Sequence, residues 1–182
     1  MKKLFFIIAT GILGSLFACT DSEFSDVWTQ YAEWRKENNE WLTAQSYRLD
    51  DYGNLYYTRV VPQWNPNAYV LIHYYNDREL TKGNLTPLYT STVAVKYYGQ
   101  MINNEPFDSS YNMTDSVFVT TSANVIPGWA IALSDMHVGD SCEVLIPSEQ
   151  AYYAQAAGTI LPFSALKFQM KLVDIPNYET KP

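Results

Sequence analysis

Apolar residues recur every three or four positions near the start of the chain. The residues concerned are Phe24, Val27, Trp28, Tyr31, Trp34, Trp41 and Leu42. This spacing predicts an amphipathic helix over residues 24–44. Three tryptophans on one helix face need a partner surface. Packing on the chain's own domain is the favoured interpretation, and a homodimer through helix 24–44 is the alternative.

After this helix the pattern changes to runs that are typical of strands. The runs are 55–61, 68–75, 90–102, 117–119 and 142–146, separated by turn signals such as Tyr52-Gly53-Asn54 and Val138-Gly139-Asp140. In the last run, Leu166, Phe168, Met170 and Leu172 alternate with polar residues, as in an antiparallel sheet with one buried face. The pattern predicts an α+β fold with about five antiparallel strands and one short central helix, because so many strands with so few helices disfavour a parallel doubly wound sheet.

The segment Val125-Ile126-Pro127-Gly128-Trp129 predicts the start of the short helix. Proline is favoured at the first helical position because the N–H that it lacks would be unpaired there. An indole at a helix start can form the floor of a pocket, with the free N–H groups of the first turn at its rim. A tryptophan that belongs only to the core is the alternative interpretation.

The first residues have the features of an export signal. Lys2-Lys3 precedes an apolar run, Leu4 to Phe17, that is too short to span a bilayer. Leu16-Phe17-Ala18-Cys19 resembles the lipobox of bacterial lipoproteins, although Phe17 is bulkier than usual there. The resemblance implies a signal peptide over 1–18, lipidation of Cys19, a short polar tether at 20–24, and a lipid-anchored protein of the bacterial cell envelope, in the outer membrane and facing the periplasm or the exterior. An ordinary signal peptide with a chance cysteine is the alternative.

Composition excludes several other functions. Removing Lys2 and Lys3 from the 12 basic residues leaves 10 against 19 acidic residues, a net charge of −9, which argues against a nucleic-acid partner.

Cys142 lies in an apolar run and is interpreted as a small buried residue. His73 and His137 are far apart in the chain and are not interleaved with other ligands, and no nucleophile or phosphate-binding motif is present. The sequence therefore predicts no metal and no cofactor.

From Thr92 to Ile175, the order of motifs resembles the FKBP family of peptidyl-prolyl isomerases. The matching segments are Val95–Gly99, Phe107–Ser110, Val125–Trp129, Met136–Asp140, Ile146-Pro147, Ala151-Tyr152 and Leu166–Phe168. The resemblance implies a curved antiparallel sheet wrapped around one short helix. It also implies four segments: the signal peptide 1–18, an extension 19–66, an FKBP-like domain 67–176 and a tail 177–182.

The resemblance further implies a catalytic pocket. Its catalytic positions are Tyr97, Phe107, Asp108, Ile126, Trp129, Tyr152 and Phe168, and its substrate-binding positions are Val125 and Ile160. Trp129 would form the floor, and the Ile126 N–H and the Tyr152 hydroxyl would bind carbonyl groups of a proline-containing polypeptide. The chain departs from the family at Met113, Ser116, Tyr153 and Thr159. These departures bear on catalytic efficiency.

The function expected from this resemblance is cis–trans isomerisation of X–Pro bonds in exported proteins. One alternative is a chaperone or assembly module that binds proline-containing segments without turnover. The other is a surface lipoprotein that binds glycans through exposed rings such as that of Trp64.

Overall fold

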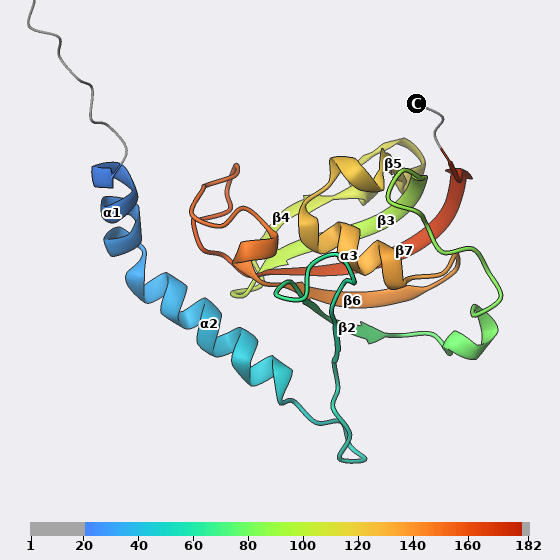
Figure 1. Cartoon of the computed structure of the whole chain (residues 1–182), viewed down its shortest axis with the longest axis horizontal. Helices are drawn as coiled ribbons and strands as arrows, with labels where there is room; N and C mark the ends of the chain where they lie inside the picture. The colour runs from blue at the N-terminus through green and yellow to red at the C-terminus, as the bar shows by residue number, and fades with distance from the viewer. Residues whose placement is uncertain (1–20, 180–182) are drawn as a thin grey trace, which may run out of the picture.

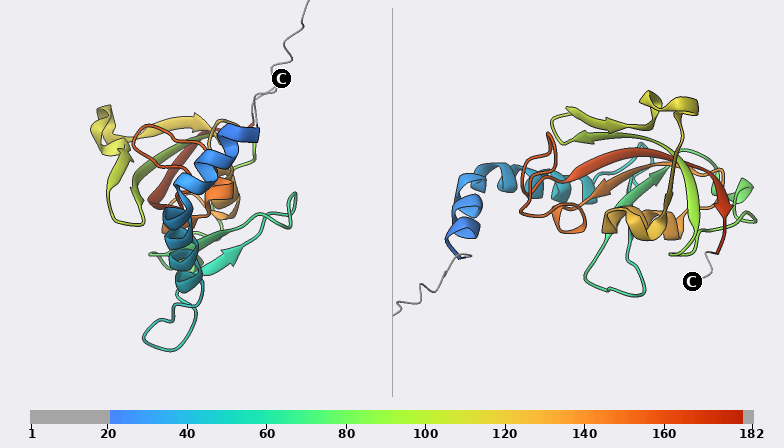
Figure 2. Two further views of the ribbon diagram at one scale, coloured as in Figure 1. Left: turned by 90° about the vertical axis from the view of Figure 1, so that its left-hand side faces the viewer. Right: turned by 90° about the horizontal axis from the view of Figure 1, so that it is seen from above.

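The computed structural model describes residues 21–179, so the predicted signal peptide and Cys19 lie outside the described residues. The described part begins with two consecutive helices, α1 (Asp21–Gln30) and α2 (Ala32–Ser46), which are separated only by Tyr31. They form an arm beside one end of a curved sheet, as Figures 1 and 2 show. The predicted helix over 24–44 is confirmed, but the predicted tether at 21–24 is wrong because those residues are helical. None of the helices in the described part is long and apolar enough to cross a membrane.

The sheet has seven antiparallel strands among the described residues. They are β1 (Thr58–Val60), β2 (Val70–Tyr74), β3 (Thr92–Met101), β4 (Pro106–Ser109), β5 (Phe118–Thr121), β6 (Ser141–Ile146) and β7 (Leu166–Asn177). Their order is β1-β2-β6-β7-β3-β4, and β5 pairs with β3. The prediction of about five strands is therefore too low. It missed β4, which opens with a proline, and the run 55–61 pairs only over the three residues of β1.

Helix α3 (Pro127–Asp135) packs across the concave face of this sheet (Figure 1). Six of its nine residues are buried, from Gly128 to Leu133. A Cβ atom at Gly128 would lie 2.3 Å from Ile146 Cγ2, so only glycine allows this approach of the helix to β6. Cys142 on β6 is fully buried, and burial raises the pKa of its thiol. The predictions of a helix at Pro127 and of a buried Cys142 are confirmed.

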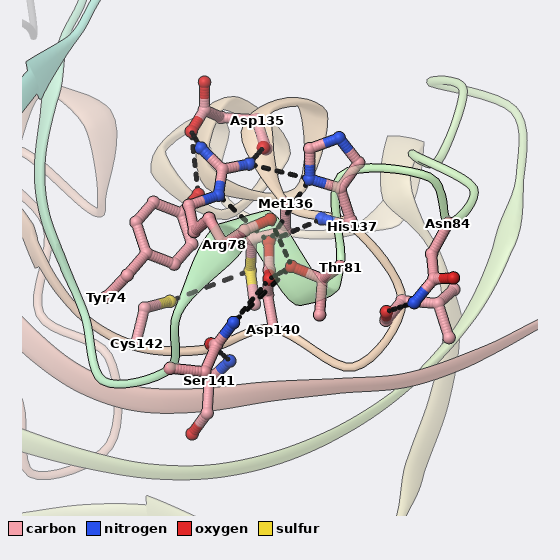
Figure 3. A network of polar contacts seen from close by, with 12 residues as sticks. Tyr74, Arg78, Thr81, Asn84, Asp135, Met136, His137, Asp140, Ser141 and Cys142 are labelled. Carbon is pink, nitrogen blue, oxygen red and sulfur yellow. Dashed lines mark hydrogen bonds and ion pairs between the residues drawn. The ribbon is translucent and has the colours of Figure 1, made fainter.

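A buried polar network fixes the end of α3 and the turn after it (Figure 3). Asp140 is fully buried, and its carboxylate accepts hydrogen bonds from the His137 backbone N–H, the Thr81 hydroxyl and the Asn76 side chain. Arg78 Nε lies 3.4 Å from the same carboxylate. Asp140 follows Gly139, whose φ of +98° is a conformation that glycine adopts readily.

The same arginine also binds the last turn of α3. Arg78 Nη1 donates to Asp135 Oδ2 at 3.2 Å, and the Tyr74 hydroxyl donates to the same oxygen at 2.7 Å. The network therefore ties the 76–84 segment to the C-terminal end of α3, the helix that carries Trp129.

Candidate functional site

A pocket of about 750 Å³ opens between the first turn of α3, the concave face of the sheet and the loop after β6. All nine site residues predicted from the sequence line it: Tyr97, Phe107, Asp108, Val125, Ile126, Trp129, Tyr152, Ile160 and Phe168. Phe118, Asn124, Ala157, Gly158 and Thr159 complete the lining. Residues from six separate parts of the chain thus meet in one concavity, which is the arrangement expected of a ligand site.

The floor and walls are aromatic rings in edge-to-face contact. The Trp129 ring lies 4.9 Å from the ring of Tyr97 and 5.3 Å from that of Phe168, measured between centroids. The Phe107 ring lies 5.4 Å from that of Phe168. Such contacts stabilise a fixed arrangement of rings beyond the area that they bury. The pocket is therefore a preformed apolar cup.

Gly99 allows two of these rings to meet. A Cβ atom at this position would lie 2.7 Å from Phe107 Cε2 and 2.8 Å from Phe168 Cε1. Because Phe107 and Phe168 pack directly over the backbone of β3, any larger residue would push both walls into the cavity. The sequence pattern did not single out this role for Gly99.

Two polar side chains of the pocket, Tyr97 and Asp108, are held in place by hydrogen bonds. The Tyr97 hydroxyl donates to Asp108 Oδ2 at 2.6 Å, and the Ser109 backbone N–H donates to Asp108 Oδ1 at 2.8 Å. Burial and the adjacent Asp108 carboxylate raise the pKa of Tyr97, so its phenol stays protonated. No cation pairs with Asp108 among the described residues, and Met113 is exposed and does not line the pocket.

Two donors at the rim have no protein partner within residues 21–179. The Ile126 backbone N–H and the Tyr152 hydroxyl make no hydrogen bond there, and Tyr152 is 39% exposed. Ile126 immediately precedes α3, so its N–H belongs to the unpaired donors of a helix start. Both groups can therefore donate to carbonyl oxygens of a bound chain.

Phe118 lines the edge of the pocket close to Ser116, the position at which the chain has serine in place of a phenylalanine common in the FKBP family. Its ring lies 5.8 Å from that of Tyr97 and 6.4 Å from that of Trp129. Phe118 was not among the site residues predicted from the sequence, although its position two residues after Ser116 was a usable signal.

Tyr153, which stands where the family usually has glycine, does not enter the pocket. Its φ is +52°, and its ring packs on Trp28 of α1 and on Phe163, at centroid distances of 6.2 and 5.7 Å. Trp28 also contacts Phe163 at 4.9 Å, and the Arg35 guanidinium lies 4.0 Å from the Trp28 ring centroid. The side chain of Tyr153 is therefore used to attach the helical arm to the pocket loop.

Helix α2 holds the same loop through hydrogen bonds. The Trp34 indole N–H donates to Ser164 Oγ at 3.0 Å, and the Ala165 backbone N–H donates to Asn38 Oδ1 at 2.8 Å. Asn38 is buried. Trp41 packs against a second small core around Leu42, Tyr57 and Leu71. The tryptophan stripe thus contacts the chain's own domain.

These contacts predict that Asn38 stabilises the loop that carries Ile160. Replacing Asn38 by alanine leaves a buried Ala165 N–H unpaired, at a cost of about 1–3 kcal/mol. We expect faster hydrogen–deuterium exchange over residues 157–165 in Asn38→Ala. The matched control is Asn39→Ala, since Asn39 is exposed on the same helix. Equal exchange in the two variants would show that the Asn38 hydrogen bond does not order the loop.

Residues 83–173 match the family model described as FKBP-type peptidyl-prolyl cis-trans isomerase. The chain is 41% identical over 90 residues to the FKBP-type 22 kDa peptidyl-prolyl cis-trans isomerase of Escherichia coli, covering 49% of this chain and 43% of that protein. It is 34% identical over 107 residues to the FKBP-type peptidyl-prolyl cis-trans isomerase FkpA of the same organism, covering 57% and 39%. The chain thus spans about two fifths of the length of these relatives.

Solved structures show the same fold. A peptidyl-prolyl cis-trans isomerase from Pseudomonas syringae pv. tomato superposes with a TM-score of 0.62 at 24% identity, covering 80% of this chain and 95% of that one. FkpA from Escherichia coli superposes with a TM-score of 0.55 at 23% identity, covering 87% and 63%. The predicted curved antiparallel sheet around a short helix is confirmed.

Proposed function

The chain belongs to the FKBP-type peptidyl-prolyl cis-trans isomerase family, and from this premise we propose that it catalyses rotation about X–Pro bonds of polypeptides in the pocket above Trp129. The observation that carries the proposal is the preformed aromatic cup, with Tyr97, Phe107 and Phe168 as walls and two unpaired donors at its rim. The reaction needs no metal and no nucleophile, and in residues 21–179 no cluster of His, Cys, Asp and Glu could hold a metal ion.

The physical problem is the barrier to rotation. Amide resonance imposes about 18–20 kcal/mol, and uncatalysed X–Pro isomerisation takes tens of seconds. The twisted amide has less charge separation than the planar amide, so moving it out of water costs less. A dry aromatic cup therefore favours the transition state over the ground state, which is the condition for catalysis.

The two rim donors would supply the remaining stabilisation of the transition state. A thousandfold acceleration requires about 4 kcal/mol of differential stabilisation. The Ile126 N–H and the Tyr152 hydroxyl would hold the carbonyls of the bound chain on both sides of the reacting bond, while Asp108 would orient the Tyr97 ring through their hydrogen bond. One or two such hydrogen bonds, together with desolvation, can stabilise the transition state by about the required 4 kcal/mol.

The proposal is tested on a polypeptide whose slow refolding phase is limited by one X–Pro bond. We expect catalytic amounts of the purified protein to shorten this phase at least about tenfold. The control is a variant of the refolding protein that lacks that proline. An unchanged slow phase, with binding of proline peptides intact, would identify a binding module without turnover.

We also propose that Cys19 carries a lipid that anchors the protein in the bacterial cell envelope. In this proposal residues 19–66 form an extension between the anchor and the FKBP-like domain, which spans residues 67–176. The lipobox-like Leu16–Cys19 supports this, and an anchor with several acyl chains would hold firmly. We expect Cys19→Ser to move the protein from the membrane fraction to the soluble fraction of its host. Retention in the membrane fraction would exclude lipidation at Cys19.

The contacts of the tryptophan stripe support packing within one chain over a homodimer through helix 24–44. Sedimentation of the purified protein distinguishes the two, and a monomer is expected.

A further inference from the structure

A second cavity adjoins the pocket at residues 125–127, the segment that leads into α3. Its volume is about 360 Å³. Its lining comes from the 64–68 loop, Tyr89, the first half of α3 and the turn after β6. Val125 lines both this cavity and the pocket, so the two adjoin at one residue.

The walls of the second cavity are two aromatic side chains that the fold leaves largely exposed. Trp64 and Tyr89 are each 61% exposed, whereas Ala130 and Ile131 beneath them are buried. The same two rings also border a hollow of about 40 Å³ with the buried Ser122. The Ser122 hydroxyl has no hydrogen-bond partner among the described residues. Exposed rings above a polar group without a partner are features of a surface that meets a ligand.

The charge at this cavity is negative. Glu149 lines it, and neither Lys, Arg nor His does. Glu149 is in none of the ion pairs within residues 21–179. The neighbouring Arg59 instead lies over the ring of Tyr69, 3.5 Å from its centroid.

We propose that this cavity is a subsite for a lysine or arginine side chain of the polypeptide that is bound in the pocket. The Trp64 and Tyr89 rings pack on the methylene stem of the lysine or arginine and contact its charged group by cation–π interaction. The Glu149 carboxylate pairs with the same charged group. The occupant is a side chain of the bound polypeptide itself, because Val125 lines both the cavity and the pocket and the two therefore share a wall. An extended chain advances about 3.3 Å per residue, so the basic residue lies within a few positions of the proline. The inference rests on the proposed function.

The test uses short peptides with one proline and a single Lys, Leu or Glu at each of the four positions on either side of it. Dissociation constants and kcat/KM are both measured with the full chain. We expect one position at which Lys binds about five- to tenfold more tightly than Leu and Glu. Trp64→Ala and Glu149→Gln should each bring the Lys to Leu ratio close to one. Tyr52→Ala and Glu105→Gln, at exposed positions that line no cavity described above, are the matched controls and should keep it.

Three outcomes would overturn the subsite: no positional effect, equal binding of Lys and Leu, or glycan binding that requires Trp64 without any preference for Lys. Binding and turnover are measured separately, so the two proposals fail in different ways. A preference for Lys without catalysis contradicts the isomerase. Catalysis without a preference for Lys contradicts only the subsite.

Discussion

Replacing Phe168 by alanine should lower kcat/KM for X–Pro isomerisation about a hundredfold. Phe168 is 4% exposed, and its ring contacts those of Trp129 and Phe107. Removing the ring widens the pocket and leaves room for water beside the bound amide, so the planar and twisted amides regain similar hydration. A hundredfold loss corresponds to about 2.7 kcal/mol of the ~4 kcal/mol that catalysis requires.

The loss must be separated from simple destabilisation, since truncating a buried phenylalanine costs about 3–5 kcal/mol of folding free energy. Leu172→Ala provides the matched control. Leu172 is fully buried on the same face of β7 but does not line the pocket. Both variants are assayed where circular dichroism shows them folded. We expect Leu172→Ala to keep its kcat/KM, and similar losses in the two variants would contradict the role of the ring. Phe168→Leu, which retains an apolar side chain, should lose about tenfold.

Replacing Asp140 by asparagine should lower the free energy of unfolding by about 3 kcal/mol at neutral pH. Arg78 would lose the ion pair with the buried carboxylate, and an amide group would face donors from His137 and Thr81. Chemical unfolding measures the effect. Asp51→Asn, at an exposed position, is the control and should change stability by less than about 0.5 kcal/mol.

This contribution depends on pH in a defined direction. Burial alone would raise the pKa of Asp140, but the hydrogen bonds that it accepts and the charge of Arg78 outweigh burial, so the pKa lies below its ordinary value of 3.8. A group with a lowered pKa in the folded state stabilises fully above the unfolded value and loses this effect as pH falls through the folded value. The difference between wild type and Asp140→Asn should therefore be constant from about pH 5 to 7 and narrow below about pH 4. A constant difference down to pH 2 would contradict the network.

The elements with a strict local period were predictable from the sequence, and those with a weak local signal were not. The alternation after Leu166 and the proline at the start of α3 are local signals, and both predictions hold. Strand β4 has four residues, starts with Pro106 and pairs with the neighbouring β3 across the 102–105 turn. A run this short that opens with proline gives only a weak strand signal, so the strand was missed although its partner is close in the chain.

The residues that line the pocket could be named in advance because the chain carries the motifs by which it resembles the FKBP family, and the resemblance implies the site. The role of Tyr153 could not be predicted, since its ring binds Trp28, which lies 125 positions earlier in the chain. The Asp140 network likewise joins segments about 60 positions apart. Contacts of this kind depend on the folded arrangement, so the helical arm's attachment to the pocket loop was visible only in the structure.

The most direct test of the central claim is the rate of cis–trans exchange of a short Ala-Pro peptide, measured by NMR exchange spectroscopy with catalytic amounts of the purified protein. We predict that exchange of the bound peptide is accelerated about a thousandfold, from tens of seconds to tens of milliseconds. Binding of the peptide in the cup above Trp129, with exchange no faster than in water, would contradict the account.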